Sequence, residues 1–99
     1  MILHTVAFRL HHRPGSDAET AFLQKANELR KLPGVIDFSV WRQTSKKNDF
    51  SFGLSMYFTS EQTYQAYNEH PDHTRFVNEV WLPQVADFMG LDYVEHSLV

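Results

Sequence analysis

The sequence has no cysteine among its 99 residues. Disulfide bonds, a thiolate nucleophile and a thiolate metal site are therefore excluded. No apolar run approaches the roughly 20 residues that cross a bilayer, and the first residues form no charged-then-apolar leader. We therefore expect a cytoplasmic protein that has no membrane partner.

Positive charge is also in short supply. Nine lysine and arginine residues stand against twelve acidic residues, which gives a formal net charge of −3. Proteins that bind nucleic acid normally present a basic face, whereas the cationic side chains here are scattered along the chain. We therefore expect no nucleic-acid partner.

Aromatic residues, by contrast, make up 14% of the chain, while glycine and proline occur only four times each. Each buried ring removes a large area from water, so a short chain that is rich in rings can build a compact core. No repeat, linker or low-complexity segment divides the sequence. The length and the composition predict a single domain over residues 1–99.

Alternating apolar and polar residues predict strands over residues 2–11, 35–43 and 50–58. The alternation in the second strand places Ile36 toward the core and Val35 toward the opposite face. Each predicted strand therefore has one side suited to a covering layer of helices.

Helical spacing of apolar residues predicts a helix over residues 17–32 and a second one from about residue 60 to residue 69. Side chains that can accept hydrogen bonds stand where each helix begins. The candidates are Ser16 or Asp17 for the first helix and Thr59 or Ser60 for the second.

A third helical segment is predicted over residues 71–81, because Pro71 suits the first turn of a helix. Pro83 interrupts the chain before a short stretch that ends at Met89. Gly90 favours a turn. After it we expect a last strand over residues 91–98.

The expected order of elements is β-α-β-β-α-β, the ferredoxin-like plan of an α+β domain with a four-stranded antiparallel sheet. Both crossovers place helices on one face. The opposite face is poor in charge, and its apolar members would be Leu3, Ala7, Val35, Trp41, Tyr57, Val94 and Leu98. A second sheet about 10 Å away would cover this face, and a second copy of the chain is its simplest source. We therefore expect a homodimer; the alternative is an uncharged face left in water.

Six histidines are many for so short a chain. His4 differs from the others because the alternation places it beside Val6 and Phe8, on the face under the helices. A buried imidazole needs hydrogen-bond partners, since a lost hydrogen bond costs about 1–3 kcal/mol. His4 is therefore either a satisfied core residue or part of the wall of a pocket.

The segment from Tyr67 to His73 is the strongest candidate for chemistry. Pro71 breaks the helical path there, and such a break lets side chains converge on a cavity. A tyrosine hydroxyl within reach of an imidazole can form an acid/base pair, and histidine titrates near neutral pH. His70 and His73 stand three residues apart, which can begin a metal site, but no third ligand is evident. We therefore expect no metal.

Several of these residues resemble a known family. His4 in the first strand, Leu32-Pro33-Gly34-Val35 after the first helix, and above all His70-Pro71-Asp72-His73 resemble the stress-responsive dimeric α/β-barrel (Dabb) family. The resemblance extends over nearly the whole chain, up to Asp92-Tyr93. It implies a ferredoxin-like subunit whose sheet closes into a barrel with the sheet of a second copy.

One plant member of the Dabb family, olivetolic acid cyclase, condenses a linear polyketide without metal or cofactor. The resemblance implies that Tyr67 and His73 hold its catalytic positions and that His4 holds a pocket position. It also implies a substrate-binding wall formed by Val6, Phe8, Phe22, Leu29 and Phe76. Three positions depart from the cyclase: Lys25, Phe52 and Val77 replace a tyrosine, a histidine and a glycine. The substrate and the pocket shape of the cyclase are therefore not carried over.

Two functions fit these residues. The first is a cofactor-independent enzyme that acts on a small apolar carbonyl compound, with His73 as general base and Tyr67 as hydrogen-bond donor. The second is a non-catalytic stress-response homodimer, in which the same residues hold a small apolar ligand or are structural. A haem-degrading or quinol-type monooxygenase is a third interpretation, by analogy of fold alone.

Overall fold

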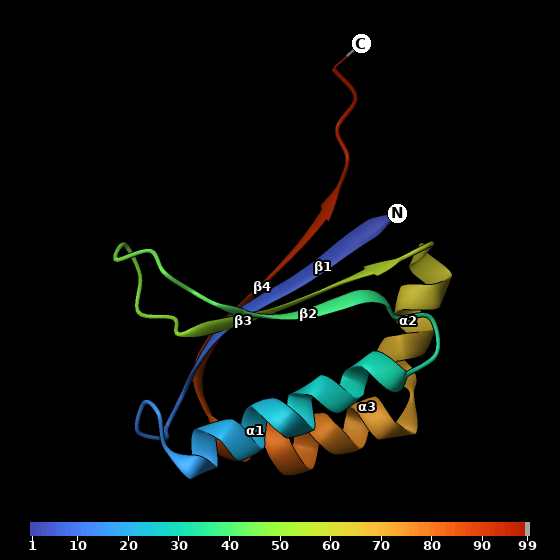
Figure 1. Cartoon of the computed structure of the whole chain (residues 1–99). Helices are drawn as coiled ribbons and strands as arrows, with labels where there is room; N and C mark the ends of the chain where they lie inside the picture. Colours follow the sequence, from blue (N-terminus) through green and yellow to red (C-terminus); the bar gives the residue numbers. More distant parts are fainter. Residues whose placement is uncertain (99) are drawn as a thin grey trace.

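The computed structural model of the chain describes residues 1–98. Its elements follow the expected β-α-β-β-α-β order (Figure 1). The strands are β1 (Ile2–Leu10), β2 (Ile36–Arg42), β3 (Phe52–Phe58) and β4 (Val85–Val94). The helices are α1 (Asp17–Asn27), α2 (Glu61–Glu69), α3 (Pro71–Phe76) and α4 (Leu82–Gln84). A 3₁₀ turn, η1 (Glu28–Lys31), extends α1, and a π-helical segment, η2 (Val77–Trp81), joins α3 to α4.

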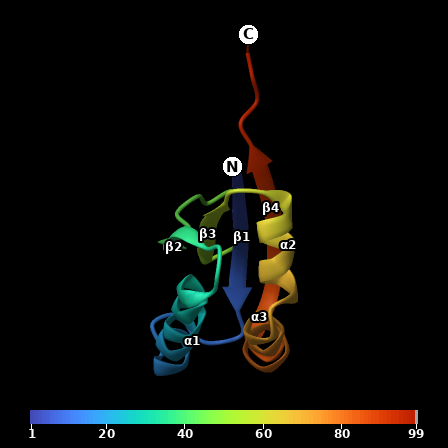
Figure 2. The same cartoon turned by 90° about the vertical axis from the view of Figure 1, so that its right-hand side faces the viewer.

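The strands form one antiparallel sheet in the order β2-β3-β1-β4. The helices gather on one face of this sheet and leave the other face open, as Figures 1 and 2 show. The predicted ferredoxin-like fold is therefore confirmed. No helix within residues 1–98 is both long and apolar enough to cross a membrane.

Serine side chains determine where α1 and α2 begin. Ser16 Oγ accepts a hydrogen bond from the Glu19 N–H, and Ser60 Oγ accepts one from the Thr63 N–H, each at 3.2 Å. These bonds satisfy backbone donors that the first turn of a helix leaves unpaired. Of the caps that the sequence left open, the structure selects the two serines.

The core lies between the sheet and the helices. Phe8, Phe22, Met56 and Phe58 are fully buried in it. The centroid of the Phe8 ring lies 5.6 Å from that of Phe22 and 5.1 Å from that of Trp81. Burying one such side chain contributes about 1.5–3 kcal/mol. These ring contacts therefore account for much of the attachment of α1 and η2 to the sheet.

β4 differs from the last strand that the sequence predicts. It includes residues 85–89, which were expected to precede the strand, and it leaves out residues 95–98. Gly90 lies in the middle of the strand. β1 provides an antiparallel partner from Ile2 to Leu10, with one register shift between Arg9 and Leu10, and the Thr5 hydroxyl donates a hydrogen bond to the Leu91 carbonyl at 2.6 Å. Pairing with an existing strand thus overrides the local turn signal of the glycine.

β2 contains an irregularity at Asp37, whose φ is +51°. Ile36 and Ser39 are three residues apart, yet they pair with β3 residues that are two apart. The extra residue forms a β-bulge and puts Ile36 on the face away from the helices, whereas Val35 packs against the core. The side predicted for both residues is wrong, because an inserted residue reverses the alternation.

The face of the sheet away from the helices, called the open face from here on, carries no charged residue between Leu3 and Ala7 of β1. Its members in the paired strands are Leu3, Thr5, Ala7, Arg9, Ile36, Ser39, Trp41, Gly53, Ser55, Tyr57, Asp87, Met89, Leu91 and Tyr93, so its charged pair, Arg9 and Asp87, lies at one end. The Trp41 side chain is 57% exposed there. Val94 and Leu98 were expected on this face but are not part of it, because β4 has a different register and ends at Val94.

Candidate active site

A pocket of about 270 Å³ lies between the sheet and the helical layer. Core-facing residues of β1, β3 and β4 form one wall, and residues from η1 to α4 form the other. The lining residues are His4, Val6, Leu29, Leu54, Met56, Tyr67, Asn68, His73, Phe76, Val77, Trp81, Leu82, Phe88 and Gly90. Most of them are apolar, so a ligand in this pocket would meet mainly hydrocarbon and a few polar groups.

The structure brings most of the residues singled out from the sequence to this pocket. Those that line it are His4, Val6, Leu29, Tyr67, His73 and Phe76. Phe8 and Phe22 do not line it. Trp81 packs against both of their rings, with centroid distances of 5.1 and 6.0 Å, and lines the pocket in their place.

The approach of Tyr67 to His73 depends on the break between α2 and α3. Pro71 disfavours a helical conformation in the residue before it, and His70 is extended, with φ −62° and ψ 134°. His70 Nδ1 accepts a hydrogen bond from the Asp72 N–H at 3.1 Å and so caps α3. The chain therefore turns between the two helices, and the ring centroids of Tyr67 and His73 lie 4.5 Å apart.

His73 is held as a neutral imidazole with a defined tautomer. Its Nδ1 lies 3.2 Å from the Asn68 carbonyl oxygen, and because a carbonyl only accepts, Nδ1 carries the hydrogen. Burial lowers the pKa of His73 below its ordinary value, and the charges of His4 and His70 lower it further, against the opposing effect of the Asn68 carbonyl. Nε2 therefore has a free lone pair near neutral pH and can accept a proton.

Tyr67 is held as a protonated hydroxyl. Its side chain is 2% exposed, and burial raises its pKa above the ordinary 10.0, with a smaller contribution from Tyr64. The side chain lines the pocket, and within residues 1–98 the structure has no fully buried side-chain polar atom without a partner, this hydroxyl included. The contact with His73 is between rings and not through a hydrogen bond. The hydroxyl is thus a donor that is available to a ligand.

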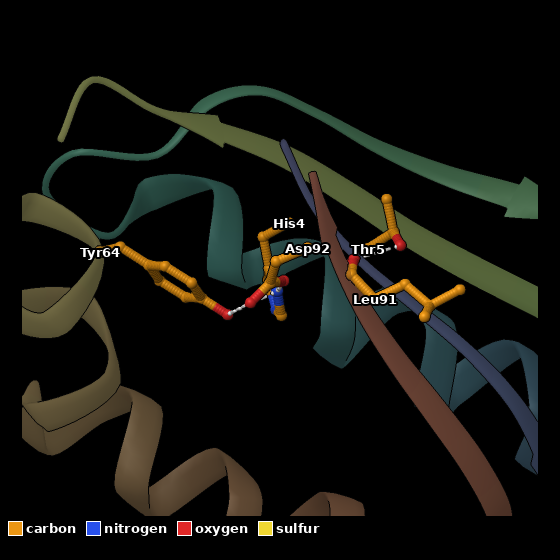
Figure 3. Close-up of polar contacts among 5 residues, drawn as sticks. All are labelled: His4, Thr5, Tyr64, Leu91 and Asp92. Carbon is orange, nitrogen blue, oxygen red and sulfur yellow. Dashed lines mark hydrogen bonds and ion pairs between the residues drawn. The ribbon is translucent and has the colours of Figure 1, made fainter. Parts of the chain in front are cut away.

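His4 has two polar partners that the sequence did not point to. Its Nδ1 lies 2.6 Å from Asp92 Oδ1 and 2.8 Å from the Tyr64 hydroxyl oxygen. The Tyr64 hydroxyl donates to Asp92 Oδ2 at 2.8 Å, and Figure 3 shows these groups meeting beside the His4 ring. Burial raises the pKa of Tyr64, and Asp92 raises it further, so this hydroxyl also stays protonated.

Two signals could have found these partners. Tyr64 stands one helical turn before Tyr67, so both rings lie on the same side of α2. Asp92 pairs directly with His4 across β1 and β4, but this register requires a strand that begins at Val85. The sequence places that strand too late, and the pairing with His4 is lost with it.

The surroundings of His70 were checked for the ligands of a metal site. Within the described part of the chain, no three histidine, aspartate or glutamate side chains are arranged to hold a metal ion. The Nδ1 lone pair of His70 is occupied by the cap of α3. The polar residues that line the pocket are His4, Tyr67, Asn68 and His73, and imidazoles beside a tyrosine hydroxyl are suited to proton transfer.

A family model matches nearly the whole chain. The model described as the Stress responsive A/B Barrel Domain, Dabb, matches residues 2–95. The chain belongs to the Dabb family. A Dabb protein of Mesorhizobium loti with a ferredoxin-like fold is similar in structure, with a TM-score of 0.96, 43% sequence identity and 97% of each chain covered. The resemblance to the Dabb family is therefore confirmed.

More distant proteins share the domain or the fold. A stress-response A/B barrel domain-containing protein of Arabidopsis thaliana is 29% identical over 96 residues, which are 95% of this chain and 36% of the plant protein. The chain thus spans about a third of the length of that relative. Hydroxynitrile lyase from Passiflora edulis shares the fold, with a TM-score of 0.85, 13% identity, and 99% of this chain and 95% of the lyase covered. Three further ferredoxin-like structures, 15%, 17% and 19% identical to the chain, are dimeric.

Proposed function

We propose that this Dabb protein is a cofactor-independent enzyme that removes a proton beside the carbonyl group of a small apolar compound. One observation carries the proposal: the pocket pairs a neutral imidazole, His73, with a hydroxyl that stays protonated, Tyr67. An enolate forms when a base takes the proton from carbon while a donor stabilises the oxygen. The two side chains supply these two groups.

In this mechanism His73 is the general base. The Asn68 carbonyl holds the hydrogen on Nδ1, so the proton from the substrate carbon goes to Nε2. Tyr67 donates its hydroxyl hydrogen to the carbonyl oxygen, whose negative charge grows as the C–H bond breaks. A positioned general base contributes about 10²–10⁴-fold to the rate.

The pocket sets the size of the substrate. An engineered cavity of about 150 Å³ holds benzene, so a pocket of about 270 Å³ accommodates one ring with a short side chain. Val77 lines the pocket and narrows it, whereas Phe52 lies in the core and Lys25 lies in a separate groove between helices. The positions that depart from olivetolic acid cyclase thus favour a substrate other than its polyketide.

One comparison and one resemblance in sequence support the proposal. The hydroxynitrile lyase from Passiflora edulis is an enzyme with this fold. The resemblance of the sequence to olivetolic acid cyclase implies catalytic positions for Tyr67 and His73 and a pocket position for His4. The physical support comes from the chain itself: the Tyr67 and His73 rings lie 4.5 Å apart, and burial lowers the pKa of His73.

We also propose that the chain is a homodimer whose subunits meet through the open face. Trp41, Met89, Leu91 and Tyr93 are each about half exposed on it, and no charge interrupts them between Leu3 and Ala7. A second sheet would remove these side chains from water. Dimers among other ferredoxin-like proteins support this arrangement.

Exchange of the methyl hydrogens of acetophenone in deuterated water tests the enzyme proposal. Acetophenone has one ring and one carbonyl, and nuclear magnetic resonance follows the exchange directly. We expect the wild type to catalyse exchange, His73→Gln to lose about 10²–10⁴-fold of the rate, and Tyr67→Phe to lose less. His11→Gln, which replaces an exposed histidine outside the pocket, is the matched control. Exchange that is equally fast in wild type and His73→Gln would refute the mechanism.

Ligand binding without turnover is the second candidate function. The Tyr67 hydroxyl favours it, because a protonated donor on the wall of the pocket suits a bound oxygen atom as well as a reacting one. Trp81 lines the pocket and reports binding by its fluorescence, with Trp41→Phe removing the other tryptophan signal. Acetophenone that quenches Trp81 without hydrogen exchange would support binding and exclude the enzyme.

A further inference from the structure

His4 is held by a cluster that the proposed mechanism does not use. Asp92 Oδ1 and the Tyr64 hydroxyl lie 2.6 and 2.8 Å from His4 Nδ1, and the same hydroxyl bonds the second carboxylate oxygen (Figure 3). The three groups therefore form a closed triangle around one ring nitrogen. The Tyr64 ring is itself fixed, because it stacks on Phe58 with centroids 4.9 Å apart.

The triangle determines which nitrogen of His4 is available. An Asp92 carboxylate accepts hydrogen bonds, so it holds a hydrogen on Nδ1. The hydrogen bonds that hold the ring both involve Nδ1, and the His4 ring lines the pocket with only 19% of its side chain exposed. Nε2 is thus the nitrogen that a substrate would meet. A purely structural link between β1 and β4 would not need this nitrogen to be open.

His4 and His73 line the same pocket from two different elements. His4 projects from β1 and His73 from α3, and both line the pocket. They are close enough for the charge of His4 to lower the pKa of His73. Each imidazole has its Nδ1 tied to an acceptor, Asp92 or the Asn68 carbonyl, so each presents Nε2.

We infer that Asp92 and Tyr64 are positioning residues for His4, and that His4 is a second proton-transfer group, which acts at a second oxygen of the substrate while His73 acts at carbon. This inference rests on the proposed function and names the substrate class more narrowly. The substrate has a carbonyl group near Tyr67 and a second carbonyl or hydroxyl oxygen near His4. A single base would serve enolate formation alone, whereas two imidazoles serve formation or cleavage of a carbon–carbon bond.

In such a step every proton is accounted for without a cofactor. His73 Nε2 takes the proton from the carbon beside the first carbonyl, and the resulting enolate carbon bonds to the second carbonyl carbon. The proton on His73 passes through water to the lone pair of His4 Nε2, and His4 Nε2 delivers it to the oxygen of the second carbonyl, so that C=O becomes C–O–H. Both imidazoles are neutral, with hydrogen on Nδ1, before and after the step. Cleavage uses the same groups in reverse.

Two reactions measured in parallel test the inference. The first is acetophenone hydrogen exchange, which requires proton transfer at carbon alone. The second is cleavage of the benzaldehyde–acetone aldol adduct, followed by the ultraviolet absorbance of the benzaldehyde released, which requires proton transfer at oxygen as well. We expect His4→Gln to lower the ratio of cleavage rate to exchange rate by about 10²-fold. Asp92→Asn and Tyr64→Phe should lower it by about 10-fold, as loss of an orienting partner does.

The controls separate this inference from the proposed function. His11→Gln and Asp49→Asn change exposed residues outside the pocket and should leave the ratio unchanged. A wild type that exchanges acetophenone but gives the same ratio as His4→Gln would overturn the role of His4 and leave the role of His73 standing. A wild type without exchange would overturn the proposed function and the catalytic role of His4 with it.

Nitrogen chemical shifts of the His4 ring test the positioning role without any substrate. We expect the wild type to show hydrogen on Nδ1, and Asp92→Asn and Tyr64→Phe to move the hydrogen partly to Nε2. Tyr93→Phe, which removes a hydroxyl from the open face, is the matched control for Tyr64→Phe. The same tautomer in all four proteins would contradict the positioning role, whatever the rates show.

Discussion

Replacing Gly34 with alanine perturbs the contact that holds the start of α2 against the sheet. Gly34 has φ +85°, and an alanine Cβ at this position would overlap Thr63 Cγ2 in the first turn of α2. Gly15 offers a matched control, because it has φ +78° and open space around its Cβ position. The two substitutions therefore share a backbone cost and differ in the overlap.

The magnitudes follow from these two terms. A left-handed conformation costs an alanine about 1–2 kcal/mol, and the lower entropy of the unfolded alanine chain offsets about 0.4–1 kcal/mol. Gly15→Ala should therefore lower the free energy of unfolding by about 1 kcal/mol. Overlap with a packed side chain adds about 1–3 kcal/mol, so Gly34→Ala should lower it by about 2–4 kcal/mol.

Urea unfolding of the two variants, alone and combined with Thr63→Ser, measures both terms. Thr63→Ser removes Cγ2 and keeps the hydroxyl that bonds Ser60, so it should restore most of the additional loss in Gly34→Ala and none of the loss in Gly15→Ala. If Gly34→Ala lost no more stability than Gly15→Ala, the close approach of α2 would be refuted. The placement of Tyr64 and Tyr67 on that helix would then need revision.

Three further predictions concern the site and the open face. The pKa of His73 is lowered on folding, so the unfolded chain binds more protons below pH 6.5. The stability of the wild type should therefore be constant above pH 6.5 and fall below it, and His73→Gln should reduce this fall in thermal melts. His4→Gln removes a charge that lowers the pKa of His73, so a titration followed by nuclear magnetic resonance should show a higher pKa for His73. Trp41→Asp places a charge on the open face and should shift sedimentation from dimer toward monomer, while the exposed control Asp49→Asn should not.

Much of the fold follows from the sequence because β1 and β3 keep a strict alternation. Phe52, Leu54, Met56 and Phe58 all face the core, as a period of two requires. The break at Pro71 was also predictable, since proline restricts the residue before it. It places Tyr67 and His73 at one pocket without any long-range information.

The parts that the sequence missed depend on pairing between distant segments. The bulge at Asp37 reverses the faces of Ile36 and Val35, and no turn residue marks it. Strand β4 takes its start and its register from β1 and not from its own glycine. The contact of Asp92 with His4 depends on that register, so the cluster around His4 became visible only in the folded chain.

The pH profile of acetophenone exchange tests the central claim most directly. If His73 is the base, the rate should be flat near neutral pH and fall only below pH 6.5, because the pKa of His73 is lowered. The rate should stay flat toward pH 10, because the pKa of Tyr67 is raised above 10.0, and His73→Gln should abolish the acidic limb. An acidic limb above pH 6.5, or one that persists in His73→Gln, would contradict the account.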